Sequence, residues 1–492
     1  MKNRPNFNIP KEISQITEVL ENAGFEAYIV GGCVRDLLIN KTPKDWDITT
    51  NAKPEDTKRL FENTFYNNDY GTVGVVNENT KEESLKVVEV TPYRLESEYS
   101  DARRPDYVEF SDSIEHDLHR RDFTINAMAR SVSKGHLIDL YKGQEDLKKG
   151  IVRAVGDPDI RFGEDALRIL RAIRISAELG FKIEEKTKNS IKKDAKMLEK
   201  IAKERIRDEF VRIIMSDRPM EAIELTRELG VLQFIAPELE EGIGIEQNKA
   251  HAFTVWEHSL RAIKYSADKK YPLEIRLSAL FHDIGKPATR RWSSEKNDWT
   301  FHGHDVVGEK MTKKILERLK FSKKQIEKIV KLVRWHLFFS DTEQITLSAV
   351  RRMVRNVGEE NIWGLMDVRE SDRIGMGRPK ANPYRLRKYK SMVEEALRDP
   401  ISVKMLKIDG DKIMEVIQET PGPKIGYILH AILEEVLENP KLNTIEELEN
   451  MAKKLAKLNE NELKKLGEKG KLKKDKLEEK EIENLRDKHW VK

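Results

Sequence analysis

The sequence predicts a multidomain protein, with a small α/β domain built on a mixed sheet, followed by domains made of helices. Its 492 residues suggest three or four domains rather than a single core. Short apolar runs between glycines and charged residues fill the first 150 positions, whereas helical periodicity dominates from Gly150 onward. The expected parts are an α/β domain (1–150), a helical segment (151–240), a histidine-rich helical domain (241–378), a helical C-terminal region (379–458) and a charged tail (459–492).

The first informative element is a strand, turn and helix near the N-terminus. Residues 26–30 are typical of a short buried strand, Gly31-Gly32 permits a tight turn, and residues 34–39 are typical of a helix. Unpaired N–H groups at a helix N-terminus attract anions, and Arg35 adds a charged donor. This pattern predicts a phosphate site at Gly32 and Arg35.

Two carboxylates follow in Asp45-Trp46-Asp47-Ile48. In an extended chain Asp45 and Asp47 point to one face, while Trp46 and Ile48 point into the core. Mg²⁺ takes one or two such carboxylates and completes its shell with water and substrate phosphates. We expect Glu89, the polar interruption of a strand-like run over 85–90, to supply a third carboxylate.

The segment Arg161–Gly180 has helical periodicity and a glycine stop. On one helix Asp165 and Arg168 would share a face, and Arg171 and Arg174 would continue it. A carboxylate beside a guanidinium can read the Watson–Crick edge of a base. The alternative is an ordinary surface ion pair.

Five motifs in order give the chain a resemblance to a known family. It resembles the class II tRNA nucleotidyltransferases and poly(A) polymerases of the DNA polymerase beta superfamily over roughly the first 240 residues. The motifs are Gly31-Gly-Cys-Val-Arg-Asp36, Asp45-Trp-Asp47, Arg120-Arg-Asp-Phe-Thr-Ile-Asn-Ala127, Glu164-Asp-Ala-Leu-Arg168 and Glu204-Arg-Ile-Arg-Asp208.

The resemblance implies a nucleotidyltransferase head of DNA polymerase beta type and assigns roles to residues. Asp45 and Asp47 would hold Mg²⁺ with help from Glu89, and Arg120 and Arg121 would contact the nucleotide. Asp165 and Arg168 would select CTP or ATP in place of a template.

The charged segment Tyr93–Pro105 lacks clean periodicity and is expected to be a mobile loop. Relatives that finish with AMP carry a comparable loop, which favours addition of both C and A.

A second constellation is built on histidine. Of 11 histidines, six fall between His251 and His336. The spacing resembles the HD phosphohydrolase domain, whose metal ligands map onto His258, His282, Asp283 and Asp372. His304 and His336 match positions used by two-metal members.

Imidazole and carboxylate ligands suit Ni, Mn, Co, Fe or Zn better than Mg²⁺ alone, and a bound water could hydrolyse a phosphoester. The resemblance implies phosphatase or 2′,3′-cyclic phosphodiesterase activity on damaged tRNA ends. The alternative is a buried His–Asp contact that only satisfies a core imidazole.

Charge and composition bound the partners and the compartment. The net charge is +4, with 90 basic and 86 acidic residues, so attraction to RNA must come from local patches. The Lys-rich stretch 182–207 is one candidate tRNA surface, although it could be a solvated helical face. A single cysteine excludes an intramolecular disulfide, and no signal-like or membrane-spanning segment is evident, which favours a cytoplasmic enzyme.

The sequence therefore predicts a Mg²⁺-dependent enzyme that adds CCA to tRNA from CTP and ATP and releases pyrophosphate. One alternative is a poly(A) polymerase or a partial adder, since the same head serves all of them. The other is a tRNA-binding or nucleotide-sensing protein centred on the HD site. The oligomeric state is left open.

Overall fold

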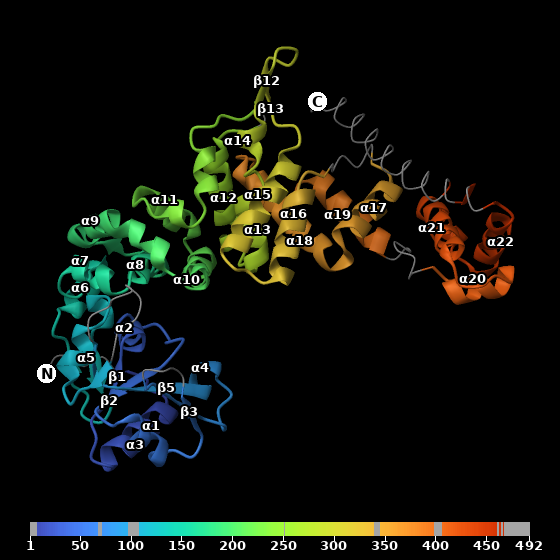
Figure 1. The fold of residues 1–492 in the computed structure, drawn as a ribbon. Helices are drawn as coiled ribbons and strands as arrows, with labels where there is room; N and C mark the ends of the chain where they lie inside the picture. Colours follow the sequence, from blue (N-terminus) through green and yellow to red (C-terminus); the bar gives the residue numbers. More distant parts are fainter. Residues whose placement is uncertain are drawn as a thin grey trace. The chain divides into compact units, whose positions relative to one another are not determined.

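The computed structural model divides into two compact units, residues 1–237 and 238–492. It describes residues 7–66, 71–96, 108–249, 251–338, 345–397, 406–459, 462, 463 and 466 (Figure 1). The expected mobile loop lies outside these residues from position 97 onward, and so does nearly all of the charged tail 459–492.

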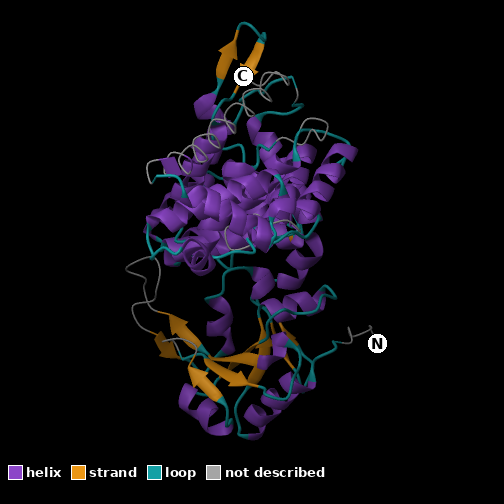
Figure 2. Ribbon diagram, turned by 90° about the vertical axis from the view of Figure 1, so that its right-hand side faces the viewer, coloured by secondary structure: helices purple, strands orange, loops and turns teal. Residues whose placement is uncertain are grey.

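A seven-stranded mixed sheet forms the centre of the first unit (Figure 2). The strand order is β3-β4-β5-β2-β1-β8-β9, in which β2 and β5 run parallel and all other neighbours run antiparallel. The prediction of a mixed sheet is confirmed. The strands are β1 Ala27–Val30, β2 Asp47–Thr50, β3 Thr64–Tyr66, β4 Val73–Val76, β5 Val87–Pro92, β8 Ala129–Ser131 and β9 Leu137–Ile138.

The central strands show why these residues form a sheet. In β5 the β-branched Val88 and Val90 are buried, while Glu89 between them is only partly buried and faces the other way. Helices α1 and α3 pack against one face of the sheet (Figure 1). The other elements of this part are α1 Lys11–Asn22, α2 Gly32–Leu38, α3 Pro54–Leu60, α4 Glu83–Lys86, the strand pair β6 Arg94–Glu96 and β7 Val108–Phe110, α5 Ile114–His119, a 3₁₀ turn Thr124–Asn126 and α6 Gly143–Lys149.

Helices follow the sheet in the first unit, with one departure from the sequence-based prediction. The expected helix from Arg161 to Gly180 is broken: α7 ends at Glu164 and α8 begins at Leu167. Between them Asp165 is extended, with φ −141° and ψ 103°, and its side chain accepts a hydrogen bond from the Leu167 amide at 3.0 Å. An aspartate that binds a nearby backbone N–H favours a helix start over a helix interior.

Asp165 and Arg168 are therefore not two positions of one continuous helix, and that expectation was wrong.

The elements of this helical part of the first unit are β10 Ile151–Val152, α7 Pro158–Glu164, α8 Leu167–Leu179, β11 Lys182–Ile183, α9 Glu185–Asp194, a 3₁₀ turn Ala195–Lys200, α10 Lys203–Met215, α11 Pro219–Glu228 and 3₁₀ turns at Leu232–Phe234 and Pro237–Gly242.

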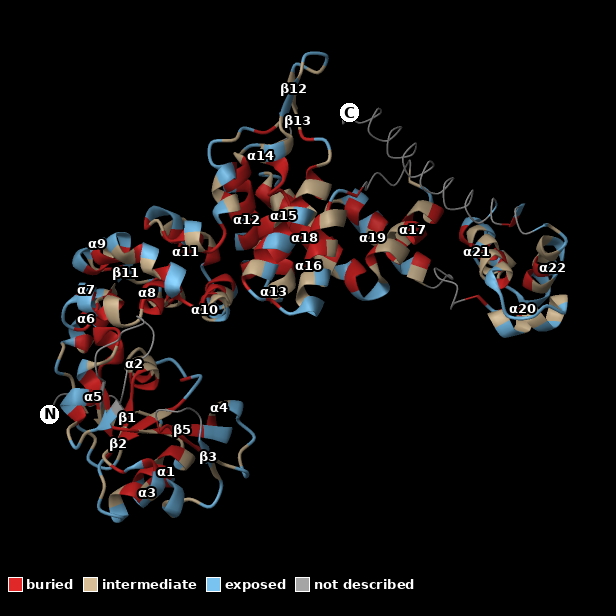
Figure 3. Ribbon diagram, viewed as in Figure 1, coloured by how far each residue is buried: buried red, intermediate tan, exposed pale blue. Residues whose placement is uncertain are grey.

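Helices also build the second unit, and the inner faces of α12, α13, α16 and α18 are buried (Figure 3). A two-stranded hairpin interrupts them between α14 and α15. The elements are α12 Val255–Asp268, α13 Leu273–Phe281, α14 Lys286–Thr289, β12 Arg291–Ser293, β13 Asp298–Thr300, α15 His304–Arg318, α16 Lys323–Trp335, α17 Leu347–Val357, α18 Glu359–Gly375, α19 Tyr384–Leu397, α20 Gly410–Ile417, α21 Pro423–Glu438, a 3₁₀ turn Pro440–Leu442 and α22 Ile445–Ala456.

Among the described residues no helix has the length and apolar character needed to span a membrane.

Candidate functional sites

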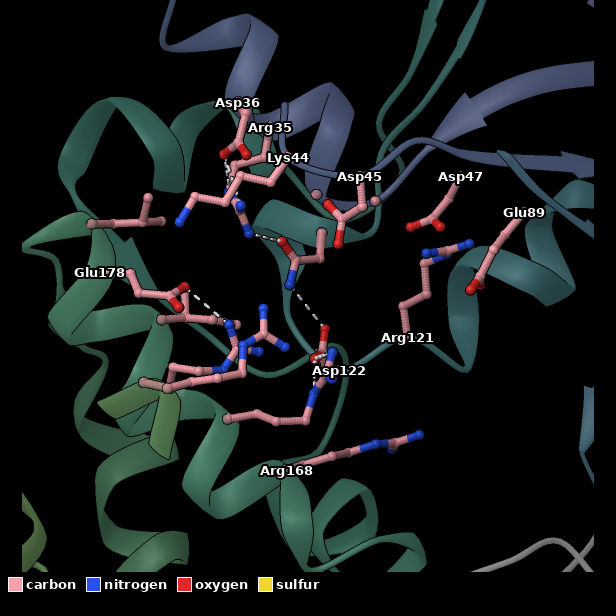
Figure 4. Close-up of a pocket in the computed structure, with 18 of the residues that line it drawn as sticks. Arg35, Asp36, Lys44, Asp45, Asp47, Glu89, Arg121, Asp122, Arg168 and Glu178 are labelled. Atoms are coloured by element: carbon pink, nitrogen blue, oxygen red, sulfur yellow. Dashed lines mark hydrogen bonds and ion pairs between the residues drawn. The ribbon is translucent and has the colours of Figure 1, made fainter. Parts of the chain in front are cut away.

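One large cavity of about 1370 Å³ lies in the first unit, and every catalytic and nucleotide-binding residue that the sequence predicted there lines it (Figure 4). Its lining includes Gly31, Gly32, Arg35, Asp45, Asp47, Glu89, Arg120, Arg121, Asp122, Asp165, Arg168, Arg171, Arg174, Arg205 and Arg212. The chemistry of the lining is carboxylates beside arginines.

The turn between β1 and α2 is packed so tightly that it needs glycine. Gly31 has φ +82°, a conformation that other residues rarely adopt. A Cβ at Gly31 would lie 3.0 Å from Nη1 of Arg121 and 3.7 Å from Oδ2 of Asp47. Next to this turn Arg35 is held in place, because its guanidinium donates to Asn126 Oδ1 at 2.8 Å and to Asp36 Oδ1 at 2.7 Å.

Three carboxylates line the same part of the cavity. In the parallel pair of β2 and β5, Asp47 lies opposite Glu89, and Asp45 is two residues before Asp47 (Figure 4). Trp46 and Ile48 are buried in the core, as the alternation predicts. Burial raises the pKa of Asp47 to about 7, and repulsion from Glu89 and Asp45 adds to the rise while Arg121 opposes it. Such a cluster of oxygen donors fits a divalent cation.

Arg120 and Arg121 are anchored by one buried carboxylate. Asp117 accepts from Arg120 Nε at 3.0 Å and from Arg121 Nη2 at 3.0 Å. Burial opposes ionisation of Asp117, but the two arginines outweigh it and lower its pKa to about 2. Figure 4 places the Arg121 guanidinium beside Asp47 and Glu89.

Asp165 and Arg168 both line the cavity, but each binds other partners. Asp165 forms an ion pair with Arg205 at 2.8 Å, from the neighbouring helix α10. Arg168 donates to Glu164 at 2.6 Å and to the Arg120 carbonyl at 2.9 Å. The structure thus brings the pair to one cavity without bonding them to each other.

The two further arginines of α8 are also held by carboxylates. Arg171 donates to Asp122 at 2.8 Å, and Arg174 donates to Glu209 at 2.7 Å and to Glu178 at 2.9 Å. The sequence argument gave Asp122 and Arg205 no role, although both stand within the recognised motifs. Their importance depends on contacts between segments 40 and 49 residues apart, which spacing does not reveal.

The second site lies in the second unit, where the structure brings the predicted histidine and aspartate ligands together. His258, His282, Asp283 and Asp372 bring ligand atoms within 4.8 Å of one another, and Asp283, His304 and His336 form a second such group. All six side chains are buried. Asp283 belongs to both groups, which is the arrangement of a carboxylate that can bridge two cations.

Three of these histidines are aimed by the backbone of their own turn. The Nδ1 atoms of His282, His304 and His336 lie 2.6–2.8 Å from the carbonyl oxygen three residues earlier, at Ala279, Phe301 and Val333. An N–H donated to these carbonyls leaves Nε2 directed into the cluster, which is how metal-binding histidines are oriented. His304 and His336 Nε2 are buried without a hydrogen-bond partner, so the donor set fits cations.

Electrostatics in the cluster act on its ligands in both directions. Although burial opposes ionisation, His282 and Lys286 hold the pKa of Asp283 well below its usual range. Burial lowers the pKa of His336 to about 4. Burial also lowers the pKa of His282, but the carboxylates of Asp283 and Asp372 outweigh burial and raise that pKa to about 10.

Lys286 and His251 are parts of this site to which the sequence argument gave no role. Lys286 Nζ lies 2.7 Å from Asp283 Oδ2 and 3.3 Å from His251 Nε2. Asp283 and Lys286 are three residues apart and therefore lie on one turn, and this spacing could have pointed to the lysine.

Comparisons with known proteins agree with both sites. Three family models match: the poly A polymerase head domain at residues 27–153, a probable RNA-binding and SrmB-binding site of polymerase A at residues 180–243, and the HD domain at residues 255–376. All of the head carboxylates and all six residues of the histidine cluster fall inside the matched ranges.

Individual relatives are CCA-adding enzymes. The enzyme of Ligilactobacillus salivarius is 34% identical over 91% of this chain and 98% of its own length. The enzyme of Leuconostoc mesenteroides is 45% identical over 51% of this chain, and that match spans 62% of the enzyme. Among solved structures, the Bacillus stearothermophilus CCA-adding enzyme in complex with CTP matches with a TM-score of 0.65 and 27% identity, over 87% of this chain and 92% of that one.

Proposed function

Because the chain belongs to the family of CCA-adding enzymes, we propose that it adds C, C and A to the 3′ end of tRNA, using CTP and ATP and releasing pyrophosphate. The observation that carries the proposal is that Asp45, Asp47 and Glu89 all line one arginine-rich cavity, with Asp47 and Glu89 opposite each other on paired strands. The Bacillus stearothermophilus CCA-adding enzyme, which was solved in complex with CTP, supports a nucleotide as the ligand of this cavity.

The head residues have defined tasks in this proposal. Asp45 and Asp47 would hold Mg²⁺, with Glu89 beside them, and the bound cation would neutralise charge on the reacting phosphates. Arg35, Arg121 and the amide of Gly32 bind the triphosphate.

The transfer forms one bond and breaks one. The tRNA 3′ oxygen bonds to the α-phosphorus, and the bond from that phosphorus to the oxygen bridging to the β-phosphate breaks. Pyrophosphate leaves with the electron pair, and Glu89 takes up the hydroxyl proton.

Base selection is assigned to Asp165 and Arg168, held from opposite sides. The ion pair to Arg205 fixes the Asp165 carboxylate, and Glu164 with the Arg120 carbonyl fixes the Arg168 guanidinium. A fixed acceptor and a fixed donor in one cavity can meet the edge of C or A without a template.

The decisive experiment supplies nucleotides separately to tRNA that lacks its 3′ CCA. Ordered addition of two C residues and then one A is expected, read on a sequencing gel. Long A tails would identify a poly(A) polymerase, and arrest after CC or dependence on a CC end would identify a partial adder.

A second function is proposed for the HD domain: metal-dependent hydrolysis of phosphoesters at RNA 3′ ends. The supporting observation is the buried cluster with its inward Nε2 atoms. We assign His258, His282, Asp283 and Asp372 to one cation, and His304 and His336 with Asp283 to a second. Ni, Mn, Co, Fe or Zn suits this donor set.

The bound cation would supply an activated water. With a 2′,3′-cyclic phosphate, the water oxygen bonds to phosphorus, one of the two ring P–O bonds breaks, and the proton goes to the released ribose oxygen. Hydrolysis of a cyclic-phosphate tRNA end by the purified enzyme, lost on chelation and restored by a transition metal, is the expected result. A wild-type enzyme that binds the metal but releases no product would contradict it.

The remaining assignments stay part of the proposal. They are a tRNA phosphate surface on the Lys-rich stretch 182–207, a tRNA-binding region at 379–458, a head at 1–150, a neck at 151–240 and an HD domain at 241–378, and a cytoplasmic location. Measured tRNA affinity that falls as salt rises would support the phosphate surface.

A further inference from the structure

The hairpin β12–β13 lies in the chain between Asp283 and His304 of the HD cluster, and a flanking residue on each side of the hairpin contacts one of them. On its N-terminal side Lys286, the first residue of α14, places Nζ 2.7 Å from Asp283 Oδ2. On its C-terminal side the Phe301 carbonyl lies 2.6 Å from His304 Nδ1. Figure 1 shows the hairpin extending beyond α14, away from the helices of the domain. Its base is thus continuous with the cluster while its strands leave the core.

An aromatic pair occupies the hairpin. Trp292 and Trp299 are direct cross-strand partners, with ring centroids 5.2 Å apart and planes at 78°. The Arg290 guanidinium lies 3.7 Å from the centroid of the Trp299 ring. Trp292 nevertheless remains 51% exposed.

Stabilisation of the hairpin accounts for only part of this arrangement. A cross-strand aromatic pair does strengthen a two-stranded hairpin, which is marginal alone. An edge-to-face contact with one partner, however, leaves about half of Trp292 exposed to solvent.

The surroundings of the tryptophans favour RNA over a protein as the partner. From Arg290 to Thr300 the two tryptophans are the only apolar side chains, whereas a protein-docking patch brings several together. The same stretch carries Arg290, Arg291 and Lys296 against Glu295 and Asp298. An aromatic face beside guanidinium groups stacks unpaired bases and attracts phosphates.

We propose that residues 290–300 form a base-stacking surface for the single-stranded 3′ end of an RNA, and that this surface presents the end to the HD cluster. The RNA contact stands on the hairpin alone. Its role in delivery rests on the hydrolase function proposed for the HD domain.

Cross-linking tests the contact without requiring hydrolysis. The full-length protein is irradiated with a short single-stranded RNA that carries 4-thiouridine near its 3′ end, and the cross-linked peptides are identified by mass spectrometry. The hairpin peptide is expected to be labelled in the wild type and in Trp292→Phe, and labelling is expected to fall about tenfold in Trp292→Ala. Trp363→Ala is the matched control, since Trp363 is also exposed but lies on α18. No labelling of the hairpin, or equal labelling of the wild type and Trp292→Ala, would overturn the proposed RNA contact. The tryptophan pair would then serve to stabilise the hairpin or to bind a protein partner.

Kinetics test the delivery role. With an RNA ending in a 2′,3′-cyclic phosphate, Trp292→Ala is expected to raise KM about tenfold with kcat nearly unchanged, and Trp292→Phe to restore KM. Hydrolysis of bis(p-nitrophenyl) phosphate, a small substrate without the RNA chain that would reach from the cluster to the hairpin, should stay unchanged. A fall in both activities would mean that the hairpin only supports the cluster, which contradicts delivery.

The two proposals fail in different ways. A wild-type enzyme that cross-links at the hairpin but hydrolyses neither substrate refutes the hydrolase function and keeps the RNA contact. A wild-type enzyme that hydrolyses the substrates without cross-linking at the hairpin refutes the RNA contact and keeps the hydrolase function.

Discussion

The head and the HD domain each gather acidic residues that fit cations, but they do so in opposite ways. The head places three carboxylates, Asp45 just before β2, Asp47 on β2 and Glu89 on β5, along the edge of a wide cavity lined by arginines. The HD domain places four histidines and two aspartates in a buried cluster between helices. The first arrangement suits a cation that arrives and leaves with a charged substrate, and the second suits a cation that stays with the protein.

The largest effect is expected from removing one of the proposed metal ligands of the head. Asp45→Ala is expected to lower CMP and AMP incorporation by about a thousandfold, because phosphate charge is no longer neutralised. HD hydrolysis and tRNA binding should persist. Asp112→Ala, an exposed aspartate of the same unit, is the matched control and should leave incorporation intact. Undiminished incorporation by Asp45→Ala would refute the head assignment.

The reciprocal change is Asp283→Ala, which removes the residue common to both histidine groups. Bound transition metal, measured by mass spectrometry of the purified protein, should be lost, and hydrolysis should fall by about a hundredfold or more. Nucleotide addition should remain.

This variant also leaves the buried Lys286 without its carboxylate, so a thermal melt must accompany it. His304→Ala is a second variant that keeps the Asp283–Lys286 pair, and Asp268→Ala, exposed on α12, is the control. Loss of nucleotide addition in a variant that still melts like the wild type would show that the two activities are coupled.

A smaller change tests how the head chooses a base. Asp165→Asn keeps the shape of the side chain but removes the charge that holds Arg205. Discrimination between CTP and UTP, measured as a ratio of kcat/KM, is expected to fall roughly tenfold to a hundredfold. Asp208→Asn, an exposed neighbour on α10, should not alter the ratio. If both variants behave alike, Asp165 is a structural ion-pair residue.

The smallest expected effect is a difference in pH dependence between the two sites. The pKa of Asp47 is raised to about 7, so below that pH a proton competes with Mg²⁺. The Mg²⁺ concentration for half-maximal incorporation should rise by up to about tenfold for each pH unit below 7, and level off above it. In the HD cluster the pKa of His282 is raised to about 10, so metal affinity there should still increase above pH 7. Parallel titrations at both sites would contradict this distinction.

The sequence could predict features whose signal is local. Alternation placed Asp45 and Asp47 opposite Trp46 and Ile48, and a polar residue within an apolar run pointed to Glu89. The histidine cluster was accessible because its spacing resembles a known domain. Helical periodicity failed at Asp165, since a side chain that caps the next helix overrides the apolar pattern around it.

Partners that meet only in the folded chain were beyond such arguments. Arg205 reaches Asp165 across 40 positions, and Asp122 reaches Arg171 across 49. Neither contact follows from a repeat or a spacing rule.

The hydrogen bonds from three cluster histidines to carbonyls three residues earlier have one last consequence. Each ring takes its direction from the backbone of its own turn rather than from the ion. If a chelator removes the metal, the three rings therefore keep their orientation, and the protein can bind metal again without unfolding. The working life of the protein can then exceed the residence time of any single ion.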